Sequence, residues 1–309
     1  MKIYFKKIHL AQKEGPMDIN YELYKVFYHV AASLSFSEAS KQLYISQSAV
    51  SQSIKILEKK LGQTLFIRST KKVQLTPAGQ VLFAHIEPAM NLIRRGESQL
   101  LDSGLLGLGQ LHIGASDTIC RYFLVPYLKE FHQKYPHVPI KVTNATSLSC
   151  VELLEQGKVD LAVINFPNAN LNPSYIQKTV CRFTDVFIAN PSYFHLKQVI
   201  SLSQLTEYPI LMLDRKSTTS EFLHNLFLQH RLELIPQIEL SSNDLLIDLA
   251  RIGLGIAIIP DYCFSREPGD LFIVQTKEPL PSRQMVAAIN PTLPTAQATE
   301  EFLALLPEA

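Results

Sequence analysis

The sequence lacks any long apolar run, and its cysteines are few. Charged residues interrupt the hydrophobic positions, so no window approaches the roughly 20 consecutive apolar residues that a membrane-spanning helix needs. The four cysteines form no CxxC pair of the kind used for zinc or redox chemistry, and they are too few for a disulfide framework. These absences exclude a membrane protein and predict a cytoplasmic, reduced one. A length of 309 residues predicts two or three domains.

Sequence signatures of catalysis are also missing. The chain contains no HExxH, no GxSxG, no phosphate-binding lysine loop and no clustered pair among its nine histidines. We therefore expect no enzymatic activity, no metal and no cofactor. A glycine-containing stretch at 104–109 precedes an expected strand and is not followed by GK[ST], so we interpret it as a linker.

Charge is divided unevenly along the chain. Residues 1–76 carry 12 lysines and arginines against 5 acidic residues, a net charge of +7, whereas residues 77–309 carry 17 against 23, a net charge of −6. A basic N-terminal quarter predicts that this end of the protein meets a polyanion. Residues 1–16 have no apolar core of signal-peptide length, so we treat them as an N-terminal extension, either a disordered arm or a segment upstream of a start at Met17.

The pattern between residues 17 and 76 predicts three helices followed by a two-stranded wing. Apolar spacing, serine caps and Gly62 indicate where the helices begin and end. The expected helices cover 21–32, 39–43 and 47–61, and the expected strands cover 65–68 and 73–75. This order is typical of a winged helix-turn-helix, in which the last helix enters the major groove of DNA.

The third predicted helix presents side chains suited to DNA. Glutamine can pair bidentately with adenine, serine can bind a base or a phosphate, and lysine can bind the backbone. Ala49, Val50, Ile54 and Leu57 fall on its buried arc. The alternative, a solvated face on an ordinary three-helix unit, is disfavoured by the lysine-tipped wing and the local positive charge. The predicted DNA-binding residues are Gln47, Ser48, Ser51, Gln52, Lys55, Arg68, Lys71 and Lys72.

A long helix is expected over the linker 77–107, because Thr76 caps it and Pro77 occupies its first position. Its apolar residues are spaced by three and four, as in a seam that packs against a partner helix. We predict dimerisation there, the alternative being an amphipathic helix that packs on its own domain. The predicted seam residues are Leu82, Ile86, Ala89, Ile93 and Leu100, with Gly96 as a weak point.

From Leu111 onward, short apolar strands alternate with helices, which predicts two α/β units with parallel sheets. Residues 166–270 are expected to form a second lobe, entered through Asn165-Phe166-Pro167. The first lobe is expected to comprise 108–165 and 271–309, because the C-terminal tail is too short to form a third domain.

Residues 36–79 resemble the winged helix-turn-helix of LysR-type transcriptional regulators; they are FSEASKQLYISQSAVSQSIKILEKKLGQTLFIRSTKKVQLTPAG. The linker helix, residues 111–163 and the segment DLARIGLGIAIIP at 248–260 are similar to other parts of that family. The resemblance implies a winged helix-turn-helix (mainly α) plus linker helix, then a two-lobed α/β effector domain like that of periplasmic binding proteins. It also implies a homodimer or homotetramer that binds promoter DNA and responds to a small metabolite held between the lobes.

Hydroxyl groups at the expected strand ends indicate where that metabolite binds. Ligands of open α/β sheets lie beyond the carboxyl ends of strands, where helix N-termini present free N–H groups. Simple helix capping is the alternative role for each hydroxyl, and Asp117 suits a ligand ammonium rather than an anion. The candidate effector-binding residues are Ser116, Asp117, Thr118, Thr146, Ser147, Asn165, Arg215 and Ser217.

Two further hypotheses concern function. A redox-sensing regulator requires a reactive Cys120, for which a buried, inert thiol is the favoured interpretation. A solute-binding module with an incidental basic N-terminus is the alternative from another class, and the helix-turn-helix pattern disfavours it.

Overall fold

The computed structural model describes residues 19–309 apart from 69–71, 102–107, 197 and 265–269. The chain divides into two compact units between Met90 and Asn91, and each unit is described by itself. Within the described residues, no helix combines the length and the apolar character needed to cross a membrane.

The first unit is a three-helix bundle with a two-stranded wing, as the sequence predicted. Side chains of Asn20, Ser35 and Ser46 cap the three helices by accepting backbone N–H bonds. Fully buried Phe27, Val50 and Ile54 belong to the hydrophobic core that joins them. The elements are α1 (Tyr21–Ser33), α2 (Phe36–Leu43), α3 (Gln47–Leu61), β1 (Phe66–Arg68) and β2 (Val73–Leu75).

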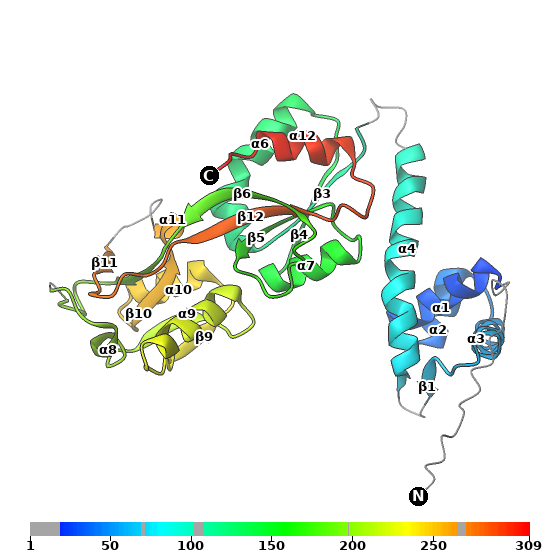
Figure 1. Cartoon of the computed structure of the whole chain (residues 1–309), viewed down its shortest axis with the longest axis horizontal. Helices are drawn as coiled ribbons and strands as arrows, with labels where there is room; N and C mark the ends of the chain where they lie inside the picture. Colours follow the sequence, from blue (N-terminus) through cyan, green and yellow to red (C-terminus); the bar gives the residue numbers. More distant parts are fainter. Residues whose placement is uncertain (1–18, 69–71, 102–107, 197, 265–269) are drawn as a thin grey trace, which may run out of the picture. The chain divides into compact units, whose positions relative to one another are not determined.

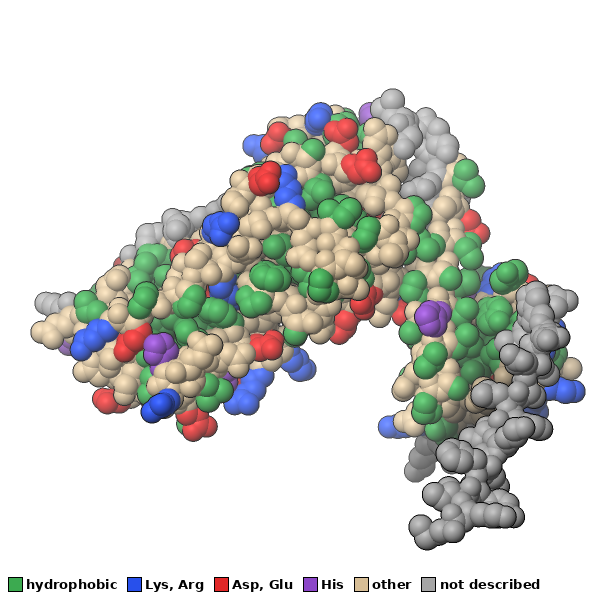
Figure 2. All heavy atoms as spheres, in the orientation of Figure 1, with side chains coloured by type: hydrophobic (Ala, Val, Ile, Leu, Met, Phe, Trp, Pro, Cys, Tyr) green, Lys and Arg blue, Asp and Glu red, His purple; other side chains and the backbone are tan. Residues whose placement is uncertain are grey.

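Helix α4 (Pro77–Leu101) begins in the first unit and ends in the second. Leu82 and Ile86 pack against the core of the winged helix, so the first half of the predicted seam is engaged within its own domain. Ile93 and Leu100, further along, are 55% and 78% exposed. Figure 2 shows hydrophobic side chains along the surface of α4. The predicted seam therefore consists of a half that is partly covered by its own domain, at Leu82 and Ile86, and a half that is exposed at Ile93 and Leu100.

The second unit contains two five-stranded sheets, and the first of them defines lobe I. Its strand order is β4-β3-β5-β12-β6, parallel from β4 to β5, with β12 antiparallel to both of its neighbours. Figure 1 shows α6 and α12 on one face of this sheet and α7 on the other. The strands are β3 (Leu111–Ala115), β4 (Ile140–Asn144), β5 (Leu161–Phe166), β6 (Ile176–Phe183) and β12 (Arg283–Ile289). The helices are α5 (Asp117–Ile119), the π-helical turn η2 (Cys120–Leu124), α6 (Val125–Lys134), α7 (Ser147–Glu155) and α12 (Gln297–Leu305).

The second sheet defines lobe II and has the order β11-β7-β10-β8-β9. Helices α8 and α9 pack on one face of it, and α10 and α11 on the other. The strands are β7 (Asp185–Ala189), β8 (Ile210–Leu213), β9 (Ile238–Leu240), β10 (Ile256–Pro260) and β11 (Phe272–Val274). The helices are α8 (Leu202–Leu205), α9 (Thr218–Gln229), α10 (Asn243–Arg251) and α11 (Asp261–Phe264).

The chain crosses between the lobes at different points from those predicted. Strand β6, expected within lobe II, pairs with β12 in lobe I, and β11, expected within lobe I, pairs with β7 in lobe II. The first crossover is therefore Thr184, and not Asn165-Phe166-Pro167; the second lies between Val274 and Arg283. Local periodicity did not predict the sheet to which either strand belongs, because pairing between strands far apart in the chain leaves no local pattern.

Candidate functional site

The N-terminal half of α3 presents a polar face to solvent. Ser46 caps the helix by accepting from the backbone N–H of Ala49 at 3.2 Å, and its Oγ lies 2.9 Å from Ser48 Oγ. Gln47, Ser48, Gln52 and Lys55 are exposed and Ser51 is half-buried, as their predicted role requires. Val50, Ile54 and Leu57 are fully buried, whereas Ala49 is exposed, which corrects its predicted place on the buried arc.

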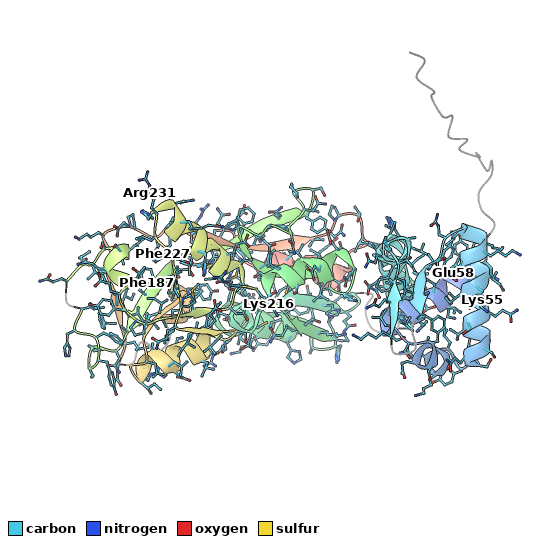
Figure 3. The ribbon with its side chains drawn as sticks, turned by 90° about the horizontal axis from the view of Figure 1, so that it is seen from below. Lys55, Glu58, Phe187, Lys216, Phe227 and Arg231 are labelled. Atoms are coloured by element: carbon cyan, nitrogen blue, oxygen red, sulfur yellow. The ribbon has the colours of Figure 1, made fainter. Side chains whose placement is uncertain are left out.

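The wing is held to α3 by a carboxylate whose role no sequence pattern indicated. Glu58 Oε1 accepts from the backbone N–H groups of Leu65 at 2.8 Å and Phe66 at 3.3 Å, at the start of β1. Figure 3 labels Lys55 and Glu58 on α3. Since Leu65 and Phe66 are buried, both of their backbone N–H groups need an acceptor. The feature of the sequence that could have indicated this contact is a carboxylate on the preceding helix.

Two of the three predicted wing residues, Arg68 and Lys72, belong to the described part of the chain. Arg68 is the last residue of β1 and pairs with Val73, and Lys72 is exposed. Lys71 lies outside the described residues. A further exposed side chain, Tyr44, follows α2 in the turn before α3; it is 96% exposed with a φ of 54°.

In lobe I, the predicted hydroxyls cap helices. Ser116 Oγ accepts from the backbone N–H of Ile119 at 3.3 Å, and Thr146 Oγ1 accepts from that of Ser149 at 3.3 Å. Buried Ser147 accepts from the backbone N–H of Asn165 at 3.1 Å. Capping, the alternative considered for these residues, is therefore present, although a hydroxyl can still donate one bond to a ligand.

A set of contacts joins the start of lobe I to the first turn of α10 in lobe II. Asn243 Nδ2 donates to Thr118 Oγ1 at 3.0 Å, the Tyr122 hydroxyl donates to Asp244, and Arg121 Nη1 lies 3.3 Å from Asp244 Oδ2. Burial, then the bond to Asp244, raises the pKa of Tyr122. Tyr122 packs into the hydrophobic core of lobe II although it belongs to lobe I. These residues, which we call the inter-lobe latch, hold the lobes together beside Asp117.

A pocket of about 520 Å³ lies between α9 and the segment that follows β5. None of the eight predicted effector-binding residues is among the described residues that line it. Arg215, a predicted effector-binding residue, has a side chain that is 75% exposed and lies 3.9 Å from Glu239, and Ser217 caps α9. The lining residues are Phe166, Pro167, Asn168, Ala169, Thr218, Glu221, Phe222, Asn225, Leu226, Gln229 and Pro281.

A buried ion pair joins the two crossover segments behind this pocket. Arg283 Nη1, at the start of β12, donates to Asp185 Oδ2 at 2.9 Å and to Thr219 Oγ1 at 3.0 Å. Its guanidinium lies 4.7 Å from the centre of the Phe222 ring and 5.1 Å from that of Phe183. Burial raises the pKa of Asp185, an effect that the Arg283 guanidinium opposes. No motif marked this pair in the sequence.

The cysteines and the metal-ligand residue types form no second site in the described part of the chain. Burial, with a smaller contribution from Asp117, raises the pKa of Cys120 to about 11, and burial raises that of Cys150 to about 12. A redox-sensing thiol needs the opposite shift, toward the thiolate, so Cys120 fits an unreactive thiol. No group of three histidine, cysteine, aspartate or glutamate side chains that could hold a metal occurs among the described residues.

Models of known protein families match both parts of the chain. The family model for bacterial regulatory helix-turn-helix proteins of the lysR family matches residues 21–80, and that for the LysR substrate binding domain matches residues 107–309. The HTH-type transcriptional activator CmpR of Synechocystis sp. is 28% identical over 248 residues, which is 79% of this chain and 80% of that protein.

Solved structures show the same fold over nearly the whole chain. Full-length OxyR from Pseudomonas aeruginosa aligns with a TM-score of 0.66 at 20% identity, covering 93% of each chain. Full-length CbnR complexed with its target DNA aligns with a TM-score of 0.65 at 18% identity, covering 93% of this chain and 99% of that one.

Proposed function

Because the chain belongs to the LysR family of transcriptional regulators, we propose that α3 contacts promoter bases and that a small molecule bound between the lobes changes those contacts. The chain is a DNA-binding regulator with an effector-binding domain and not an enzyme. The observation that carries the proposal for DNA is the exposed polar face of α3, backed by the buried core of the winged helix.

Base contact is assigned to the first two turns of α3. Gln47 and Gln52 have amide groups that can donate and accept toward adenine, and Ser48 and Ser51 supply short hydroxyls beside them. Lys55 is assigned to the phosphate backbone, with Arg68, Lys71 and Lys72 contributing from the wing. This division leaves base specificity to α3 and gives the wing a sequence-independent share of the affinity.

The effector is assigned to the pocket between α9 and the segment after β5. Three observations support this assignment: the volume is of the size that small-molecule sites have, the walls come from both lobes, and Phe222 in the wall contacts the buried Arg283. The hydroxyls of Ser116, Thr118 and Thr146, which do not line this pocket, are assigned to closing the lobes around the ligand. Closure would change the pocket most where lobe I and lobe II residues face each other.

Dimerisation is assigned to the second half of α4. Ile93 and Leu100 are large, apolar and more than half exposed, and a second copy of the helix would remove them from water. A homodimer presents two copies of α3 to two half-sites, and a homotetramer pairs two such dimers. Promoter DNA in the cytoplasm is the site of action that this assembly fits.

The test is selection of duplexes by the full chain from a random DNA library, followed by anisotropy titration with the selected sequence. Enrichment of a motif with two half-sites supports α3 as the recognition helix and the dimer. If no motif is enriched, the base-contact assignment fails. Repeating the titration across a metabolite panel, with thermal shift as an independent binding measurement, tests whether effector binding changes the affinity for DNA.

A further inference from the structure

The pocket between α9 and the segment that follows β5 carries negative charge in its polar part. Among the described residues that line it, Glu221 is the single charged side chain, and neither lysine, arginine nor histidine is present. The remaining polar groups are neutral: Asn168, Thr218, Asn225 and Gln229. An acidic ligand therefore finds no side-chain counter-charge in this lining.

The positive charges near the pocket are engaged or directed elsewhere. Arg283 lies behind Phe222, is 1% exposed along its side chain and is neutralised by Asp185 at 2.9 Å. Lys216, labelled in Figure 3, precedes α9 and is exposed, but it does not line the pocket. A buried guanidinium already paired with a carboxylate adds little net charge at the far side of a ring.

The N-terminus of α9 does not make up for the missing charge. Thr218 is its first residue, and the partial positive charge of a helix start favours anions. Glu221 lies in this first turn, so the chain itself already places a carboxylate against that partial charge. A second carboxylate, brought by a ligand, would be repelled by Glu221.

The apolar part of the wall has planar and rigid components. Phe166 and Phe222 supply rings from the two lobes, and Pro167, Leu226 and Pro281 complete the surface. We propose that this pocket selects a planar ring compound carrying a nitrogen donor group, uncharged or cationic, over the corresponding acid. The ring packs against the two phenylalanines, and its N–H groups face Glu221 and the side-chain amides. This assignment rests on the proposed function, because it describes the ligand class of the same effector pocket.

Three probes of nearly the same shape test the charge preference: benzamidine, benzamide and benzoate. Their dissociation constants for the full chain are measured by ligand-observed NMR titration. We expect benzamidine to bind about twofold to fivefold more tightly than benzamide, the range for a solvent-exposed ion pair, and benzoate to bind most weakly. In Glu221→Gln, benzamidine should fall to the affinity of benzamide and benzoate should gain, while benzamide should change little.

Location is tested by filling the pocket from an exposed position. Asn225→Trp should abolish binding of benzamidine and benzamide, whereas Leu228→Trp, on the same helix but outside the lining, should leave both unchanged. The proposal is overturned if benzoate binds more tightly than benzamide, if neither benzamidine nor benzamide binds, or if Asn225→Trp leaves binding intact. If the probes bind in the expected order and DNA affinity does not respond, the ligand class stands and the effector role of the pocket fails.

Discussion

Individual hydroxyl side chains in this protein perform a structural task that limits what sequence can say about their chemistry. Ser116, Thr146 and Ser217 each accept a bond from a backbone N–H at the start of a helix. The sequence shows that a hydroxyl follows a strand, but it does not show from which donor the hydroxyl oxygen accepts a hydrogen bond. Glu58 and Arg283 illustrate the reverse case, because their partners are distant backbone or side-chain groups that no local pattern indicates.

Helix α3, the proposed recognition helix, gives the first prediction at this scale. Gln52→Ala should cost about 1 to 3 kcal/mol at particular base pairs, because a bidentate amide contact is lost there. Lys72→Ala should weaken binding to all sequences alike and reduce the salt dependence by about one phosphate contact. Anisotropy titrations against single-base variants of the selected duplex check both. An unchanged base preference in Gln52→Ala would contradict the assigned face.

The second prediction concerns Glu58. Glu58→Ala leaves the buried N–H groups of Leu65 and Phe66 without their acceptor, which should cost about 1 to 3 kcal/mol of unfolding free energy. Glu58→Gln keeps a carbonyl oxygen and should cost less. Urea denaturation measures both variants, and DNA binding of Glu58→Ala should weaken without a change in base preference. Equal stability of Glu58→Ala and the wild type would show that water replaces the carboxylate.

At the scale of elements, α4 performs two tasks along one helix. Its first half packs on the winged helix, and its second half presents the exposed apolar side chains of Ile93 and Leu100. The spacing of three and four residues described this helix correctly but did not separate the two tasks, because both need the same periodicity.

This division gives the third prediction. Ile93→Glu, at an exposed position, should shift the chain toward monomer while leaving its melting temperature nearly unchanged. Ile86→Glu places a charge against the core of the winged helix and should lower the melting temperature instead. Sedimentation and thermal denaturation distinguish the two. A dimer as tight in Ile93→Glu as in the wild type would place dimerisation elsewhere.

Elements defined by local signals were predicted well, and those defined by distant pairing were not. The bounds of α3 and β2 match the predicted ones, because caps, glycine and short apolar runs determine them. Membership of the sheets failed for β6 and β11, since their partners are about a hundred and about eighty residues away in the chain. The pocket was not predicted from the sequence for the same reason, because its residues come from segments that only the crossovers bring together.

At the scale of the whole effector domain, the inter-lobe latch joins the two lobes in the arrangement that the structure describes. Thr118→Val removes the acceptor of the hydrogen bond that Asn243 donates. This change should destabilise the arrangement in which the lobes are joined by about 0.5 to 1.5 kcal/mol. We expect weaker effector binding with nearly unchanged DNA affinity in the absence of effector. Calorimetry with an identified effector measures this. Tyr122→Phe, which keeps the buried ring, is the matched variant for the bond to Asp244.

The position of β12 has a consequence for the order in which the protein matures during synthesis. This strand lies in the interior of the lobe I sheet, between β5 and β6, yet it is translated about a hundred residues after both of them. Until it arrives, β5 has an unpaired edge and the sensor is incomplete, whereas every contact that builds the winged helix has already been translated. Each nascent chain therefore acquires the fold that meets DNA well before it acquires the fold that meets the signal.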